Sequence, residues 1–424
     1  MKNIKETLGQ GGLDRELTTL YGSEKLGAAR ERTLRVLEGF EGTFARPAEA
    51  LFSAPGRTEI GGNHTDHQHG HVLAGAVDLD LLAAVAVTRD GTVRVLSEGY
   101  PMIEVDLSML TPQAGEANTS AALIRGVCAR MTALGCDFGG QGLEVYMTSD
   151  VPGGSGLSSS AAFEVLFGTI FNHLFWNEKA TAVEIAQIGQ YAENVFFGKP
   201  CGLMDQTASS VGGVVAIDFA DPAAPMVERV ELDLHAQGYA LCILDSHASH
   251  ADLTGEYAAI TDELKAVSGY FGKEVLRDIP EPDFYAALPQ LRERAGDRAV
   301  LRAMHFYTED SRARWEAEAL KAGLFQDFLT LVRESGNSSA MCLQNVTPTG
   351  AVEEQALMVT IALAQRLLGE LGAARVHGGG FGGTAQAFVP LDVLEEFKTR
   401  MEAVLGQGSC HVVTIRPVGG VRLA

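Results

Sequence analysis

The chain has no long hydrophobic run, and its six cysteines are scattered along 424 residues. No stretch approaches the roughly 20 apolar residues that a membrane-spanning helix needs, and residues 1–7 lack the apolar core of a signal peptide. The cysteines show none of the close pairs typical of zinc sites, which is the pattern of reduced, mostly buried thiols. We therefore expect a cytoplasmic protein that does not insert into a membrane.

Basic residues are few and form no run, and the formal net charge is −21 at pH 7. Nucleic acids and anionic membranes attract proteins through basic patches, so both are poor candidates as partners. An acidic protein that binds a nucleotide must hold the phosphates with local N–H groups, a metal ion and a few placed cations. The sequence also lacks internal repeats and low-complexity segments. We expect small-molecule ligands and, in the absence of a sequence signal for oligomeric state, a monomer.

The length and the order of the apolar patterns predict an α+β protein of two lobes. The first fifty residues are charged and helical in pattern and form an N-terminal lead-in. Residues 51–225 alternate between strands and helices and form a first domain. A segment with Pro222 and Pro225 leads into a second domain, residues 226–424, which is rich in long helices.

Turn signals and periodicity predict several individual elements. Asp90-Gly91 stands between the apolar runs 82–88 and 92–97, which is a strong signal for a tight hairpin of two paired strands. Helices are predicted at residues 121–134, 158–176, 181–197, 255–270, 310–334 and 350–371.

The most informative segment is Pro-Gly-Gly-Ser-Gly-Leu-Ser-Ser-Ser-Ala-Ala at residues 152–162. Backbone N–H groups, the positive end of a helix dipole and side-chain hydroxyls meet there, which suits a polyphosphate and its metal ion. The segment lacks the lysine of a Walker loop and the closing glycine of a nucleophile elbow. A small-residue turn that caps a helix is the alternative interpretation.

A second polar segment, residues 53–70, gathers an arginine, histidines, an aspartate and amides between glycines. Each hydroxyl of a polyol needs both a donor and an acceptor, so such a segment suits sugar recognition. Arg57 would be a fixed cation, and Asp66 would accept hydrogen bonds from adjacent hydroxyls. A solvated polar loop is the alternative.

The same region carries four histidines that could suggest a metal site: His64, His67, His69 and His71. Interrupting glycines disfavour that site, as does the lack of a clearly placed carboxylate or thiol ligand.

Two carboxylates, Glu193 and Asp205, lie on either side of a Pro-Gly turn. Such a pair can divide the work of phosphoryl transfer, because one can hold the metal while the other receives or orients the attacking hydroxyl. Taken alone, Asp205 could equally be a helix cap.

Residues 377–384, His-Gly-Gly-Gly-Phe-Gly-Gly-Thr, contain the pattern G-x-G-x-x-G. A dinucleotide-binding fingerprint must follow a strand and open a helix. Here a helix is predicted before the pattern and a strand after it, at residues 384–389. We therefore expect a tight loop packed against another backbone.

Together, these segments resemble the three motifs of the GHMP family of sugar and small-molecule kinases. The first resembles the galactokinase signature, in which Gly-Arg is followed by Gly-x-His-Thr-Asp. The resemblance extends from about residue 53 to the C-terminus and is highly specific in the motifs. It implies the two-lobed GHMP kinase fold, with a ferredoxin-like C-terminal lobe and the active site between the lobes.

The resemblance also implies ligands and residue roles. The substrates would be ATP and a galactose-type sugar, with Mg²⁺ as cofactor. Asp205 would be the catalytic aspartate, Arg57 would stabilise the transferred charge, and Ser160 and Glu193 would hold the metal ion. The ATP phosphate loop would comprise Gly154, Ser155, Gly156, Leu157, Ser158, Ser159 and Ser160. The sugar would contact Asn63, His64, Asp66, Gly202 and Tyr257.

Three departures from the family pattern concern the sugar. Galactokinases usually carry glutamate directly before His-Thr-Asp, facing the C6 hydroxyl, whereas this chain has Asn63. Asp-His-Gln at residues 66–68 resembles the galacturonate-kinase branch, and Ser249-His250 stands where the family has Arg-His. The expected activity is phosphorylation of D-galactose to galactose 1-phosphate. The alternatives are a kinase for galacturonate or another galactose-type sugar, and a non-catalytic sugar sensor, which the intact segment 158–162 disfavours.

Overall fold

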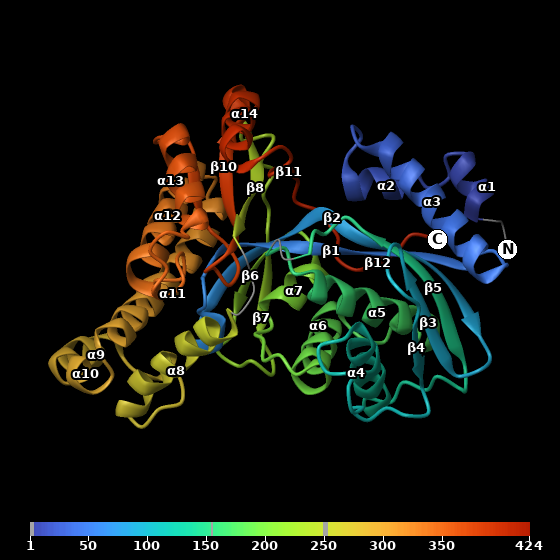
Figure 1. Cartoon of the computed structure of the whole chain (residues 1–424), viewed down its shortest axis with the longest axis horizontal. Coiled ribbons are helices and arrows are strands. Elements are labelled where there is room, and N and C mark those ends of the chain that lie inside the picture. Colours follow the sequence, from blue (N-terminus) through green and yellow to red (C-terminus); the bar gives the residue numbers. More distant parts are fainter. Residues whose placement is uncertain (1–3, 154–155, 249–252) are drawn as a thin grey trace.

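A computed structural model describes residues 4–153, 156–248 and 253–424, which form two lobes, each built on a β-sheet (Figure 1). The strands of the large sheet are β1 (Ala50–Gly61), β2 (His71–Thr88), β3 (Thr92–Ser97), β4 (Ile103–Asp106), β5 (Gly142–Ser149), β6 (Val214–Asp218), β7 (Met226–Val230) and β12 (Val421–Arg422). Those of the small sheet are β8 (Tyr239–Ala248), β9 (Ala373–Val376), β10 (Gly383–Pro390) and β11 (Cys410–Val413).

The helices in the first half of the chain are α1 (Ile4–Gly9), α2 (Asp14–Tyr21), α3 (Leu26–Phe44), η1 (Asp66–Gln68), α4 (Ser120–Ala133), α5 (Ser159–Phe175), α6 (Ala182–Tyr191), η2 (Ala192–Phe197) and α7 (Met204–Val211). Those in the second half are α8 (Thr254–Tyr270), η3 (Leu276–Asp278), α9 (Glu281–Ala286), α10 (Leu288–Arg294), α11 (Asp297–Lys321), α12 (Phe325–Ser338), η4 (Ser339–Leu343), α13 (Ala356–Leu368), η5 (Leu391–Val393) and α14 (Leu394–Leu405).

The large sheet has the strand order β12-β1-β2-β5-β3-β4, with β6 on β2 and β7 on β6, and the small sheet has the order β11-β8-β10-β9. Helices α4–α7 cover one face of the large sheet and α1–α3 cover the other (Figure 1). Successive strand residues point to opposite faces, so Leu51 packs with α1–α3 while Phe52 packs in the other core.

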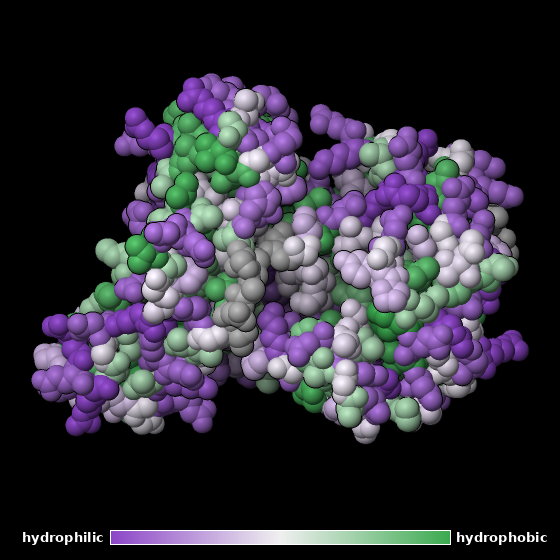
Figure 2. Space-filling model, viewed as in Figure 1, coloured by the Kyte–Doolittle hydropathy of each residue, from purple (hydrophilic) through white to green (hydrophobic). Residues whose placement is uncertain are grey.

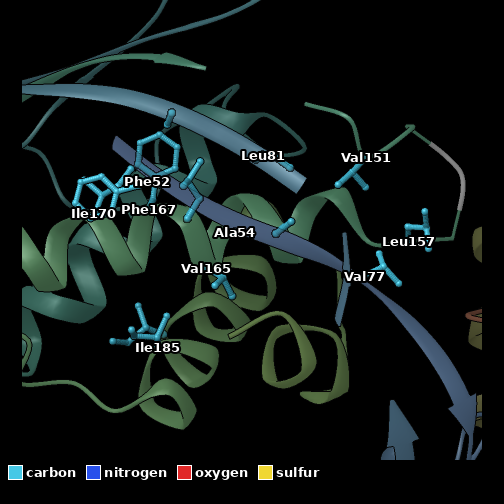
Figure 3. Close-up of a cluster of buried hydrophobic side chains, with 14 of the residues drawn as sticks. Phe52, Ala54, Val77, Leu81, Val151, Leu157, Val165, Phe167, Ile170 and Ile185 are labelled. Carbon is cyan, nitrogen blue, oxygen red and sulfur yellow. The ribbon is translucent and has the colours of Figure 1, made fainter. Parts of the chain in front are cut away.

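The core beneath the large sheet anchors the predicted phosphate loop at both ends. Val151 and Leu157, which flank that loop, are buried in the same cluster as Ala54 of β1 and Val165 of α5 (Figure 3). Burial of apolar side chains on both sides fixes where the loop leaves β5 and where it enters α5.

The N-terminal helices are also held to the sheet by a buried ionic group. Asp80 of β2 is fully buried and accepts hydrogen bonds from Tyr21 (2.7 Å), Arg32 (2.6 Å) and Arg416 (2.7 Å). Burial alone would raise the pKa of Asp80, but the guanidinium groups of Arg32 and Arg416 outweigh it and hold the pKa below its ordinary value. The lead-in is thus tied both to the sheet and to a segment near the C-terminus.

The predicted division of the chain at residue 225 stays a prediction. Strand β7 directly follows that boundary and still pairs with β6 of the large sheet, through the register Val214↔Val230. The chain also returns to the large sheet at β12, which pairs with β1. The large sheet therefore takes strands from both sides of the predicted boundary.

The predicted hairpin at Asp90-Gly91 is wrong in its pairing. Strands β2 and β3 lie on opposite sides of β5, which is antiparallel to β2 and parallel to β3. The turn itself forms, with Gly91 at φ +66°. A turn signal predicts that the chain reverses, but not which strand it pairs with, and the apolar strand β5 takes the place between the two.

The helix predicted at residues 310–334 is two helices. Gly323, at φ +71°, separates α11 from α12. The left-handed conformation that glycine adopts readily ends the first helix there. The helix predicted at residues 181–197 likewise changes from α6 into the π-helical turn η2 at Ala192.

None of the helices in the described ranges combines the length and the apolar character that crossing a bilayer requires. Figure 2 shows hydrophilic side chains over most of the visible face and a hydrophobic area at the upper left, where α13 lies.

Candidate active site

Arg57 and Asp205 come together from two separate motifs. Arg57 Nε donates to Asp205 Oδ1 at 2.6 Å and Nη2 donates to Oδ2 at 2.5 Å, which is a bidentate ion pair. Burial alone would raise the pKa of Asp205, but Arg57 and a hydrogen bond with Ser158 lower it. Asp205 is therefore an ionised carboxylate. It lies in the first turn of α7, where the N-cap is Leu203, so the helix-cap interpretation does not hold.

The predicted phosphate loop lies directly on the same arginine. The Arg57 backbone N–H donates to Leu157 O at 3.0 Å, and its guanidinium donates to Gly156 O. A Cβ on Gly56 would lie 2.9 Å from Leu157 O, so this close approach requires glycine. Helix α5 begins at Ser159, next to this contact. The helix N-terminus that could face a phosphate is thus beside the Arg57–Asp205 pair.

Two residues of the predicted phosphate loop, Gly154 and Ser155, lie outside the described residues. The described part of that loop comprises Gly156, Leu157, Ser158, Ser159 and Ser160. Ser158 has φ +56°, a left-handed conformation that is uncommon for a residue other than glycine and that turns the chain into α5.

The two predicted metal ligands also lie together. Ser160 Oγ donates to Glu193 Oε1 at 3.2 Å, and Glu193 is 3% exposed on η2. Hydroxyl and carboxylate oxygens are ligands that Mg²⁺ accepts, usually together with substrate phosphates, so this donor set fits that ion. No cluster of three or more His, Cys, Asp or Glu within the described ranges could hold a metal ion by itself.

Glu164, a buried carboxylate of α5, was missed from the sequence. Gln206 Nε2 donates to Glu164 Oε2 at 2.9 Å and to Glu193 Oε2 at 3.0 Å, so the amide bridges two acids. Burial, and then the nearby Glu193, raise the pKa of Glu164 well above its ordinary value. The signal in the sequence was a glutamate within an apolar helical run, four residues after Ser160.

The sugar-binding candidates Asp66 and Gly202 are in close contact. A Cβ on Gly202 would lie 1.8 Å from Asp66 Oδ2. The Asp66 side chain is 11% exposed, and its Oδ1 accepts a hydrogen bond from the backbone of His67. The first and second motifs therefore meet here a second time, in addition to their contact at the Arg57–Asp205 pair.

His64 and Tyr257 attach the third glycine loop to this region. His64 Nε2 is 3.0 Å from Gly379 O, and Tyr257 Oη donates to Gly380 O at 3.1 Å. Burial, and then His67, lower the pKa of His64 to about 4, so its imidazole is neutral at pH 7. A neutral ring that donates from Nε2 leaves Nδ1 as an acceptor.

The third loop is packed against other parts of the backbone, as its glycines predicted. A Cβ on Gly380 would lie 2.2 Å from Asn345 O, and one on Gly379 would lie 2.5 Å from the Tyr257 ring. A helix was predicted directly before this loop, but strand β9 precedes it instead. Strand β10 follows the loop, as predicted. Because no helix opens after the glycines, the dinucleotide interpretation remains excluded.

The third loop also reaches the phosphate loop. Thr384 Oγ1 is 2.6 Å from His377 Nε2, and a Cβ on Gly156 would lie 2.7 Å from the same Thr384 oxygen. All three motifs are thus brought together around Gly156 and Arg57.

Asn63 behaves differently from the other sugar-binding candidates. Its side chain is fully buried, and both its amide nitrogen and its amide oxygen have protein partners. A sugar hydroxyl would have to displace one of these partners to reach it. The predicted contact between Asn63 and the sugar therefore finds no support in this arrangement.

Comparisons with known proteins agree with the geometry. The model for the N-terminal domain of GHMP kinases matches residues 122–213, and the galactokinase galactose-binding signature matches residues 38–87. A galactokinase of Streptomyces coelicolor is 32% identical over 396 residues, covering 91% of this chain and 97% of that protein. A galactokinase of Glaesserella parasuis serovar 5 is 32% identical over 360 residues, covering 85% of this chain and 90% of that protein.

Solved structures show the same fold. The crystal structure of Lactococcus lactis galactokinase complexed with galactose is similar with a TM-score of 0.78 and 27% identity, covering 91% of this chain and 98% of that one. A crystal structure of mevalonate kinase is similar with a TM-score of 0.57 and 16% identity, covering 85% and 97%, which speaks to the fold alone.

Proposed function

Because the chain belongs to the galactokinase family of GHMP kinases, which are sugar phosphotransferases, we propose that it phosphorylates the anomeric hydroxyl of D-galactose with ATP. The products are galactose 1-phosphate and ADP. The observation that carries the proposal is the bidentate Arg57–Asp205 pair, which lies against the backbone of the phosphate loop at Gly156.

Phosphoryl transfer asks a protein mainly to align the reacting groups and to stabilise charge. In the proposed reaction, Asp205 accepts a hydrogen bond from the C1 hydroxyl and receives its proton. Arg57 keeps Asp205 ionised and offsets the negative charge that builds up on the transferred group. His64, Asp66, Gly202 and Tyr257 surround the sugar, and the backbone of residues 154–160 holds the phosphates.

Ser160 and Glu193 are the proposed ligands of Mg²⁺, supported by their 3.2 Å contact and by the oxygen chemistry of both groups. When bound, the ion neutralises the phosphate oxygens of ATP. All of these residues come from one chain, which supports the proposal that the enzyme works as a monomer.

The comparisons favour galactose over galacturonate, because both curated relatives are galactokinases and the galactokinase galactose-binding signature matches residues 38–87. The acids near the first motif do not decide between the two sugars, since Glu59 pairs with Arg375 and Glu309 pairs with Arg312. We therefore propose the neutral sugar as substrate.

An ADP-release assay with equal concentrations of D-galactose and D-galacturonate tests the proposal. We expect turnover with galactose to exceed turnover with galacturonate by about tenfold or more. Preferred turnover of galacturonate would overturn the choice of sugar. Sugar binding without ADP release would instead indicate a non-catalytic sugar sensor.

A further inference from the structure

Asn63 connects four separate parts of the chain. Its Nδ2 donates to Glu59 Oε1 and to Gly378 O, both at 2.8 Å. Its Oδ1 accepts from Asn345 Nδ2 at 2.8 Å and from Ser339 Oγ at 3.3 Å. The side chain thus joins β1, the third glycine loop, η4 and the segment that follows η4.

The backbone of this loop is held as firmly as the Asn63 side chain. His305 Nε2 donates to Asn63 O at 2.9 Å, and Glu309 Oε1 accepts from the Gly62 N–H at 3.0 Å and from the Asn63 N–H at 3.4 Å. Both His305 and Glu309 lie on α11 and are buried. Because unpaired buried polar groups are costly, each of these contacts resists movement of the loop.

Glu59 is the second member of the arrangement. It is 2% exposed, and Oε1, which accepts from Asn63, also accepts from Arg375 Nη2 at 2.8 Å. Arg375 is fully buried and donates to Ile60 O at 2.5 Å, so this pair fixes the end of β1. Burial raises the pKa of Glu59 to about 7, which Arg375 and then Arg57 partly offset.

The surroundings of residue 63 require an amide. On one side stand two acceptors, the Glu59 carboxylate and the Gly378 carbonyl, and on the other stand the donors of Ser339 and Asn345. An amide satisfies both sides, whereas an ionised carboxylate has no hydrogen to donate. A glutamate or aspartate at this position would lose two hydrogen bonds and place a second negative charge beside Glu59.

We propose that Glu59 and Asn63 form a positioning pair that fixes the segment carrying the sugar-binding residues His64 and Asp66, with His64 held against the third glycine loop. This inference rests on the proposed function. Residue 63 then influences sugar binding through its two neighbours, without touching the sugar. In this chain Glu59 supplies the carboxylate of the pair, and Asn63 supplies the amide that donates to it.

The substitution Asn63→Asp tests the pair, because it keeps the size of the side chain and removes its donor. At pH 8.5, where a proton shared between two carboxylates is disfavoured, we expect the KM for galactose to rise by about tenfold and the melting temperature to fall. The KM for ATP should stay within about twofold of wild type, because the four hydrogen-bond partners of the Asn63 side chain among the described residues all lie outside the phosphate loop.

The double variant E59Q/N63D reverses the direction of the hydrogen bond, since the new amide at position 59 can donate to the new carboxylate at position 63. We expect the double variant to reverse at least about half of the rise in log KM that N63D causes. It should also recover at least about half of the fall in melting temperature. Glu59→Gln alone is the matched control, because the amide oxygen that it introduces can still accept from Asn63. Additive losses in the double variant would overturn the proposal, as would a wild-type KM and melting temperature in N63D.

A direct sugar contact predicts a different pattern. If Asn63 bound the C6 hydroxyl, N63D would change the affinity for galactose and that for 6-deoxy-D-galactose, measured as a competitive inhibitor, by different factors, because only galactose carries that hydroxyl. If Glu59 and Asn63 are a positioning pair, N63D weakens the binding of both sugars by the same factor, and unequal factors would overturn the proposal.

If N63D does not fold, recovery of folding in E59Q/N63D supports the pair, and failure to recover overturns it. If the wild-type protein releases no ADP with any hexose, the proposed function fails, while thermal unfolding still measures the coupling.

Discussion

Asp66 Oδ2 occupies the space that a β-carbon on Gly202 would need, at a separation of 1.8 Å. The second motif therefore contacts the first through a glycine. The position of the Asp66 carboxylate depends on the absence of a side chain at residue 202.

Gly202→Ala should weaken sugar binding. The new methyl group must displace the Asp66 carboxylate, so we expect the KM for galactose to rise by about tenfold or more while the KM for ATP changes little. Steady-state kinetics with each substrate varied in turn measures both values. Gly42→Ala is the matched control, because no atom lies within 4 Å of a β-carbon there. Equal effects of the two substitutions would contradict the steric argument.

Arg57→Gln should move the acid limb of the pH profile. Burial alone raises the pKa of Asp205, and Arg57 is the main group that lowers it. Without the guanidinium the pKa of Asp205 rises, so kcat should begin to fall at a higher pH than in the wild type. A profile of kcat from pH 5 to pH 9 measures the shift.

Asp205→Asn separates this charge effect from the loss of the base itself. Asparagine cannot accept the proton at any pH, so kcat should fall by about 10²–10⁴-fold across the whole profile while ATP still binds. If the Arg57→Gln variant kept the acid limb of the wild type, Arg57 would not be what keeps Asp205 ionised.

The sequence predicted well which residues come together where the contact depends on backbone conformation or on a motif, while the roles of these residues stay predictions. Glycines at 56, 156, 202 and 380 all stand at close approaches that exclude a β-carbon. Arg57, Ser160, Glu193 and Asp205 come together in two contacting pairs, as their motifs implied. These contacts could be predicted because the proposed chemistry requires particular residue types at fixed spacing.

What the sequence could not predict depends on partners distant in the chain. Asn63 and Glu59 are four residues apart, but their roles depend on Asn345, Arg375 and Gly378, which belong to the second half of the chain. The position of β5 between β2 and β3 could not be predicted for a related reason. A turn signal indicates where the chain reverses, but not which strands then pair. Local patterns predict elements, whereas pairing depends on the whole core.

Glu164→Gln should change how stability depends on pH. Burial, and then Glu193, raise the pKa of Glu164 well above its ordinary value, so the folded protein keeps a proton that the unfolded chain releases at neutral pH. The free energy of unfolding therefore falls as pH rises above the ordinary pKa of glutamate, and glutamine removes this dependence. Thermal unfolding between pH 6 and pH 8.5 should show a smaller loss of stability in the variant. Parallel curves for the two proteins would mean that Glu164 is ionised in the folded state.

Tyr21→Phe tests whether the N-terminal helices stabilise the fold without taking part in catalysis. The Tyr21 hydroxyl donates to the fully buried Asp80 at 2.7 Å, and the phenylalanine variant removes that hydrogen bond while keeping the ring. We expect the free energy of unfolding in urea to fall by roughly 1–2 kcal/mol, since a hydrogen bond to a buried charge is lost. Tyr100→Phe is the control, because Tyr100 is 71% exposed and its substitution should change stability by less than about 0.5 kcal/mol.

The kcat of Tyr21→Phe should stay close to that of the wild type, because Arg32 and Arg416 still hold Asp80 in place. A large loss of kcat with unchanged stability would contradict this expectation. It would mean that the contacts of Asp80 with the N-terminal helices influence catalysis from the opposite face of the sheet.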